Sequence, residues 1–67
     1  MNKRIRWATG DKVKIIDNAS SHFGKTGILI EPKRVPVYGK LQYHWFVKIE
    51  GTETIELFAP EQLEKID

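Results

Sequence analysis

The chain has 67 residues and no cysteine, so it forms at most one domain, and neither a disulfide nor a thiolate–metal site can stabilise its core. The net charge of +2 hides an asymmetry, because every Lys and Arg except Lys65 lies in residues 1–48 and six of the nine acidic residues lie in residues 49–67. If the fold separates these segments, a basic side would suit nucleic acid or an acidic protein; the alternative is an ordinary solvated surface.

Residues 1–8 form a basic N-terminal segment that contains Arg4 and Arg6. This segment lacks the apolar run of a signal peptide, and no stretch of the chain approaches the roughly 20 apolar residues of a membrane span. We therefore expect a single domain over residues 1–67, located in the cytoplasm and without membrane insertion. The absence of cysteine fits that reducing compartment.

Two strands are expected in the first half of the chain. Val13 and Ile15 share one parity and have a lysine between them, which predicts a half-buried strand. After a polar loop, the apolar run at residues 28–30 predicts a strand that is buried on both faces. Pro32 has no backbone N–H to donate and is expected to end this strand.

Residues 32–42 are the least regular part of the chain. Pro32, Pro36 and Gly39 argue against a helix, while Val35 and Val37 argue against a plain linker. We expect a long structured loop, with a hairpin tip as one form of it, that projects from the rest of the domain.

The clearest strand covers residues 43–49, which are rich in aromatic and β-branched side chains. Trp45, Val47 and Ile49 fall on one face of it, and Trp45 is expected in the core. A tight turn at Glu50 and the following glycine ends this strand.

The end of the chain predicts a strand, a helical turn and a last strand. Ile55 and Leu57 are expected to point inward from the first of these strands. Pro60 suits the first turn of a helix, so a single helical turn is expected over residues 60–63, before a short strand at residues 64–66.

Residues 10–31 resemble the KOW motif, a strand–loop–strand unit of bacterial transcription elongation factors of the NusG type and of a large-subunit ribosomal protein. The resemblance is carried by Gly10-Asp11, the Val13/Ile15 alternation, Gly24-Lys25-Thr26-Gly27 and the apolar run that follows. In that family the glycine after the loop permits an unusual backbone, and basic loop residues contact RNA or a protein. The resemblance implies that Gly24 and Gly27 hold the turn and that the contacts include Lys12, Lys14 and Lys25.

The rest of the chain is similar to the wider SH3-like class. Residues 58–64 also resemble the ending of small SH3-like docking subunits of photosynthetic complexes, such as the PsaE-like subunits of photosystem I, which dock ferredoxin and carry no cofactor. The long segment at residues 32–42 departs from those subunits. The resulting prediction is an all-β fold: a five-stranded, partly open SH3-like barrel with a short helical turn before the last strand.

Aromatic side chains interleaved with cations suit nucleic acid, because rings stack on bases and cations neutralise phosphates. Tyr38 stands beside Lys33, Arg34 and Lys40 and is a candidate contact. Trp7 stands beside Arg4 and Arg6, and it either makes a contact or covers the open end of the barrel. The candidate binding residues are therefore Arg4, Arg6, Trp7, Lys12, Lys14, Lys25, Lys33, Arg34, Tyr38 and Lys40.

Catalytic patterns are weak in this sequence. His22 follows Ser20 and Ser21, but neighbours in sequence need not have the geometry of a catalytic triad. Residues 24–26 match the end of a phosphate-binding P-loop, but Ala19 replaces the first glycine of that motif. We expect no enzyme activity, no metal site and no cofactor.

Three functions are compatible with these features. The first is a KOW-like module that contacts RNA or DNA through residues 20–25 and 33–40. The second is an accessory subunit that docks on an acidic protein such as a ferredoxin, for which the apolar Val35, Val37 and Tyr38 are suitable anchors. A phage- or mobile-element-encoded inhibitor is a third possibility that the small size allows.

Overall fold

A computed structural model of the chain describes residues 6–66. It contains five β-strands and one short 3₁₀ helix, in the order β1 (Lys12–Ile15), β2 (Thr26–Val37), β3 (Lys40–Ile49), β4 (Ile55–Phe58), η1 (Pro60–Gln62) and β5 (Leu63–Lys65). The predicted all-β class, five strands and single helical turn are thus confirmed. No helix among residues 6–66 is long and apolar enough to cross a membrane.

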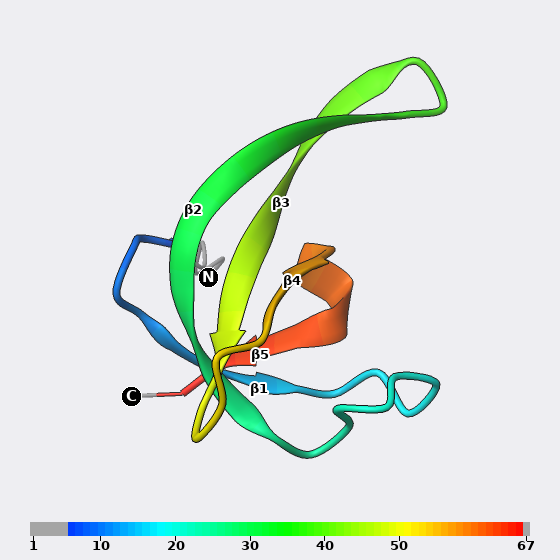
Figure 1. The fold of residues 1–67 in the computed structure, drawn as a ribbon. Helices are drawn as coiled ribbons and strands as arrows, with labels where there is room; N and C mark the ends of the chain where they lie inside the picture. Colours follow the sequence, from blue (N-terminus) through cyan, green and yellow to red (C-terminus); the bar gives the residue numbers. More distant parts are fainter. Residues whose placement is uncertain (1–5, 67) are drawn as a thin grey trace, which may run out of the picture.

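All five strands belong to one antiparallel sheet with the order β4-β3-β2-β1-β5. The first and last strands are neighbours, since Lys14 of β1 pairs with Glu64 of β5. The sheet is strongly bent, and β2 and β3 extend together well beyond the other strands (Figure 1). β4 and β5 are the two edges of the sheet, so the ladder is not closed.

The core lies on one face of the bent sheet and follows the alternation of the sequence. Val13 and Ile15 of β1 are fully buried, and Trp45 is 6% exposed, as predicted for a core residue. The remaining buried hydrophobic side chains of the described residues come from β2, β3, β4 and β5: Leu29, Val47, Ile49, Phe58 and Leu63.

The prediction that Ile55 and Leu57 point inward is wrong. They are 51% and 37% exposed, whereas Phe58 is only 3% exposed. Phe58 pairs with Trp45 across the β3–β4 ladder, so it lies on the core side together with Trp45. Side chains alternate along a strand, so when Phe58 lies on the core side, Ile55 and Leu57 lie on the opposite face.

The prediction that Pro32 ends the second strand, leaving a loop over residues 32–42, is also wrong. β2 continues to Val37, and its residues pair with β3 from Pro32↔Trp45 to Val37↔Lys40. β1 pairs with β2 only through residues 26–28. The outer part of β2 is therefore an edge strand, where a proline nitrogen can face solvent without removing a ladder hydrogen bond.

The two-stranded projection formed by residues 32–43 is called the arm below. An irregularity in the pairing between Leu29 and Glu31 separates it from the body of the sheet. At its tip, Tyr38 and Gly39 have φ angles of 50° and 79°. Positive φ at both central residues is the requirement of a tight type I′ hairpin turn, so the expected hairpin tip is present at the end of two paired strands.

Candidate nucleic-acid interface

The register of the arm sorts its side chains into two faces, because directly paired residues of an antiparallel ladder point to the same side. One face, called the basic face, carries the pairs Lys33/His44, Val35/Gln42 and Val37/Lys40. The other, called the aromatic face, continues the core side of the sheet and carries the pairs Pro32/Trp45, Arg34/Tyr43 and Pro36/Leu41.

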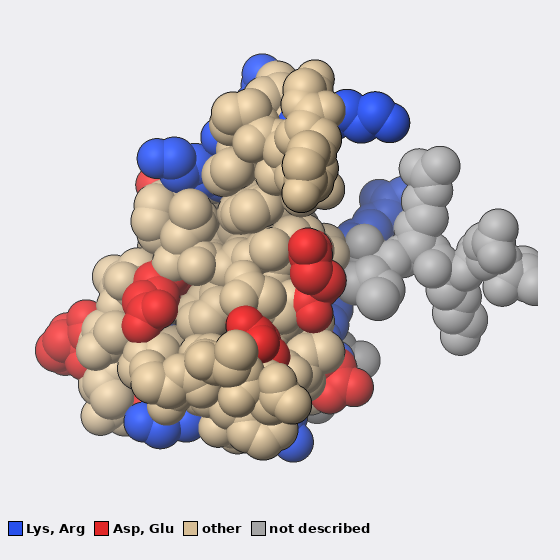
Figure 2. Space-filling model, turned by 90° about the vertical axis from the view of Figure 1, so that its right-hand side faces the viewer, with Lys and Arg blue, Asp and Glu red and all other residues tan. Residues whose placement is uncertain are grey.

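The arm concentrates positive charge. Lys33, Arg34 and Lys40 are exposed, and the sequence has no acidic residue between Glu31 and Glu50. Within the part of the chain that the structure describes, no carboxylate forms an ion pair with any of these three cations. Figure 2 shows Lys and Arg side chains around the upper projection of the molecule and acidic side chains mainly on the body beneath it.

Two lysines on the body, Lys12 and Lys48, have a different electrostatic environment. The Lys12 ammonium lies 3.8 Å from a carboxylate oxygen of Glu50, and that of Lys48 lies 3.8 Å from Glu53. Such exposed pairs contribute little stability, but they cancel local charge. The sequence predicted a basic side and an acidic side. In the structure only the arm has charges of one sign, and the body carries both cations and carboxylates.

The predicted contacts do not form one site. Lys33, Arg34, Tyr38 and Lys40 share the arm, whereas Lys12 and Lys14 lie on β1 and Lys25 lies in the loop that follows it. Figure 1 places this loop well apart from the tip of the arm. Arg4 lies outside the described residues, and Arg6 is exposed at the start of them.

A pocket of about 420 Å³ opens at the base of the arm. Its lining consists of Trp7, Pro32, Tyr43 and Trp45, which are three aromatic side chains and a proline ring. Tyr43 is 56% exposed, and the Arg34 guanidinium carbon lies 6.0 Å from the centre of its ring. This distance is at the outer limit of a cation–π contact.

Trp7 is partly buried and packs against the core. The backbone on both sides of it is held in place: the Lys65 ammonium donates to the Arg6 carbonyl at 2.8 Å, and the Ala8 N–H donates to Asp11 Oδ2 at 3.0 Å. An ion pair of 3.2 Å joins Lys65 to the same Asp11 oxygen. Trp7 therefore covers part of the core and also lines the pocket, so it can have both predicted roles.

Sequence reasoning missed Pro32 and Tyr43 as site residues. Tyr43 was counted among the aromatic residues of a strand, and Pro32 was interpreted as a strand terminator. The signal that identifies them is the pairing of residues 32–37 with residues 40–45, which places Tyr43 beside Arg34 and Pro32 beside Trp45.

The two glycines implied by the KOW resemblance have different roles. Gly24 has a φ of 85° in the turn before β2, as the resemblance implies. Gly27 lies within β2 rather than in that turn. A Cβ atom there would lie 2.5 Å from Val47 Cγ1 and 2.6 Å from the Lys48 carbonyl oxygen, so Gly27 is required for close approach of β2 and β3.

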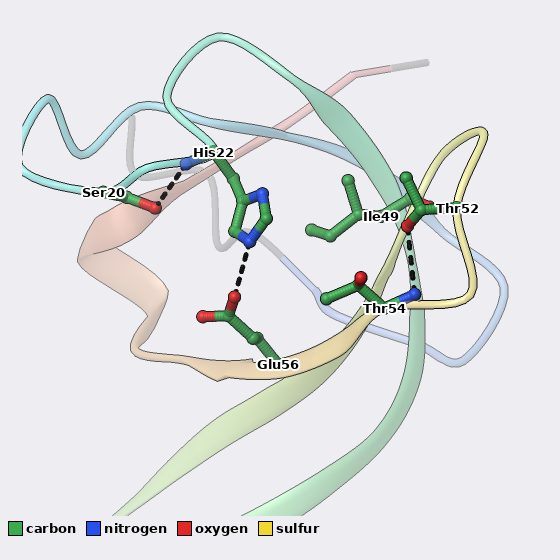
Figure 3. A network of polar contacts seen from close by, with 6 residues as sticks. All are labelled: Ser20, His22, Ile49, Thr52, Thr54 and Glu56. Atoms are coloured by element: carbon green, nitrogen blue, oxygen red, sulfur yellow. Dashed lines mark hydrogen bonds and ion pairs between the residues drawn. The ribbon is translucent and has the colours of Figure 1, made fainter.

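Ser20 and His22 form part of a local polar network (Figure 3). The Ser20 hydroxyl oxygen accepts a hydrogen bond from the His22 backbone N–H at 3.0 Å, while His22 Nε2 lies 2.5 Å from Glu56 Oε2. The histidine thus links the β1–β2 loop to β4. Among the described residues, no group of three or more His, Cys, Asp or Glu side chains is placed to hold a metal ion.

Comparison of the chain with protein-family models, with curated proteins and with solved structures gives no match. The KOW-like and SH3-like resemblances therefore stay predictions, and functional inference depends on the arm and the pocket at its base.

Proposed function

We propose that this chain is a small, cytoplasmic, non-enzymatic module that binds RNA or DNA through the arm. The single observation that carries the proposal is the set of exposed cations Lys33, Arg34 and Lys40 on a ribbon without acidic residues. Phosphate contacts dominate nucleic-acid affinity, and such contacts need cations that are not already paired with carboxylates.

The shape of the arm supports the same proposal. A two-stranded ribbon that leaves the body of its sheet gains little stability from its own contacts. Tyr38 at its tip is 101% exposed, and Leu41 is 62% exposed. A ribbon of this kind presents cations and rings together on a narrow, accessible element, which is suited to following a nucleic-acid backbone.

We also propose that the bent sheet is a KOW-like, SH3-like barrel that is partly open. Support comes from the order of its elements: consecutive antiparallel strands, a helical turn at Pro60–Gln62, and a last strand that returns to β1. Many binding functions occur on that scaffold, so the arm and not the fold supports the functional proposal.

The proposal is tested by two charge-matched double variants. Lys33→Glu/Lys40→Glu removes cations from the basic face of the arm, and Lys14→Glu/Lys25→Glu makes the same change in net charge on the body. Fluorescence anisotropy with labelled mixed-sequence RNA and DNA should show clearly weaker but measurable binding for the arm variant and near-normal binding for the body variant. Equal losses in the two variants would mean that only net charge matters.

The second candidate function is docking on an acidic protein. It is favoured by the exposed apolar side chains of the arm, Leu41 and Tyr43, because buried aromatic and aliphatic anchors dominate protein interfaces. Affinity purification from the native lysate with and without nuclease separates the two candidates. Nuclease-sensitive recovery of nucleic acid supports the first, and one stoichiometric protein that survives nuclease supports docking.

A further inference from the structure

The pocket at the base of the arm contains both tryptophans of the chain, Trp7 and Trp45, together with Tyr43 and Pro32. We propose that this pocket stacks an unpaired nucleobase, so that the ligand of the arm is single-stranded nucleic acid and not a duplex. The inference rests on the proposed function and adds to it the class of nucleic acid and the place where a base is held.

The chemistry of the lining supports a flat guest that stacks on rings. All four lining side chains carry rings, of which Tyr43 is 56% exposed and Trp45 only 6%, so Tyr43 offers the accessible stacking face. The volume of about 420 Å³ lies within the roughly 300–1,000 Å³ of small-molecule sites. Base–aromatic stacking is tolerant of sequence, since every base has a π-face. The lining offers few polar groups, so this pocket is suited to holding a base and poorly suited to reading which base it is.

The surrounding charge favours a nucleotide over an apolar peptide. Arg34 lies on the aromatic face beside Tyr43, where its guanidinium can contact the phosphate next to a stacked base. Residues 32–49 contain no acidic residue, and Glu31 of β2 and Glu50 lie just before and just after them. Within the arm itself, no carboxylate therefore opposes the attraction for the phosphates on either side of the base.

The positions of the three arm cations favour a flexible strand. Arg34 lies on the aromatic face, whereas Lys33 and Lys40 lie on the basic face of the same ribbon. A ligand that reaches all three must bend around the edge of the arm. Duplex DNA is stiff over about 150 base pairs, and its bases are stacked internally, so it meets one face and offers no base to the pocket.

The tryptophans provide the test. Intrinsic tryptophan emission of the unmodified chain is followed during titration with three probes: oligo(dT), a duplex of the same length, and an abasic deoxyribose-phosphate strand of equal charge. We expect saturable quenching by oligo(dT) alone, with affinity at least about tenfold above that for the abasic strand. Because this comparison changes only the ligand, it does not depend on the folding of any variant.

Two variants locate the contact. Tyr43→Ala should lower the affinity for oligo(dT) by about tenfold or more without changing that for the abasic strand, and Tyr43→Phe should retain normal affinity because its ring still stacks. Circular dichroism verifies that both variants are folded.

Each outcome has one meaning. Binding of oligo(dT) and of the abasic strand with equal affinity and without quenching would overturn the pocket proposal but leave nucleic-acid binding by the arm intact. Tighter binding of the duplex would likewise overturn it. Failure of all three probes to bind, together with failure of mixed-sequence RNA in the anisotropy test, would contradict the proposed function itself.

Discussion

Gly27 shows how closely a single residue controls the approach of two strands. Its position is buried, and an added Cβ would meet both the side chain of Val47 and the backbone oxygen of Lys48 at less than 3.0 Å. Since a backbone oxygen cannot rotate away as a side chain can, the β2–β3 ladder itself must shift to admit a methyl group. The long ribbon that becomes the arm begins at this contact.

Gly27→Ala should lower the free energy of unfolding by roughly 1–3 kcal/mol, the usual cost of overpacking. Urea denaturation measures the change, and Ser21→Ala in the exposed β1–β2 loop is the control, expected within about 0.5 kcal/mol of the parent. An unchanged stability of Gly27→Ala would show that β2 and β3 separate freely here.

Asp17 illustrates a second effect at the scale of one residue. The Gln62 side-chain amide donates to Asp17 Oδ2 at 2.7 Å, and the Ala19 N–H donates to Oδ1 at 3.0 Å. These hydrogen bonds, that of Gln62 first, hold the pKa of Asp17 below its usual value of 3.8. A lowered pKa means that the folded state favours the carboxylate, so its stabilising effect is present above pH 3.8 and is lost as the pH falls through the folded-state pKa.

Gln62→Leu should therefore raise the pKa of Asp17 toward 3.8, because the larger of the two hydrogen-bond effects is removed. The stability difference between parent and variant should be present at neutral pH and should shrink in acid. An NMR titration of the Asp17 side chain measures the pKa. A pKa that stays at its parental position would mean that the Ala19 N–H alone maintains it.

The arm consists of paired strands in a segment whose composition argues against strands. Residues 32–42 contain two prolines, yet they form paired strands because the outer part of β2 has a neighbour on one side only. At the tip, Tyr38 adopts a positive φ, which is uncommon for a residue other than glycine and is better tolerated by asparagine. A large, fully exposed ring at such a position is difficult to explain by folding alone.

Tyr38→Asn separates the two roles of this residue. The turn should persist, with equal or slightly higher thermal stability, because asparagine suits the left-handed conformation. If Tyr38 stacks on the ligand, binding of oligo(dT) should weaken by about 1 kcal/mol or more, whereas Tyr38→Phe should bind normally. Unchanged binding by Tyr38→Asn would restrict Tyr38 to the geometry of the turn.

The sequence predicted the core-facing side of a strand correctly where one face of that strand carries nearly all of its large apolar side chains. Val13 and Ile15 left no alternative for the core side of β1, and Trp45 had matching partners two and four residues along β3. In β4 both parities carry large apolar side chains, so Phe58 could displace Ile55 and Leu57 from the core, and only the pairing with Trp45 decides between them. Periodicity alone does not contain that information.

The sequence predicted the charged residues of the candidate site, but it did not predict the pocket at the base of the arm. Lys33, Arg34, Tyr38 and Lys40 were identified because they are near one another in sequence. The pocket joins Trp7 to Pro32 and Tyr43, which are distant in sequence and meet only through the register of two strands. The lysines of β1 and its loop were grouped with the arm by composition, but the fold places them elsewhere.

At the scale of the whole molecule, the arm is a basic projection on a body of mixed charge. Among residues 6–66, the acidic residues that follow β3 lie on the turn after it, on β4, on η1 and on β5, apart from the tip of the arm (Figures 1 and 2). A polyanion is therefore attracted first to the arm. The charges of the arm are all positive, whereas the positive and negative charges of the body nearly cancel.

The most direct test is the salt dependence of binding to a single-stranded oligonucleotide, measured between about 50 and 200 mM salt. Each phosphate contact on a single strand contributes about 0.7 to the slope of log affinity against log salt concentration. The account predicts that Lys33→Glu/Lys40→Glu flattens the slope by about 1.4 relative to the parent, while Lys14→Glu/Lys25→Glu leaves it nearly unchanged. A slope that is the same in the parent and the arm variant would contradict the claim that the arm carries the binding.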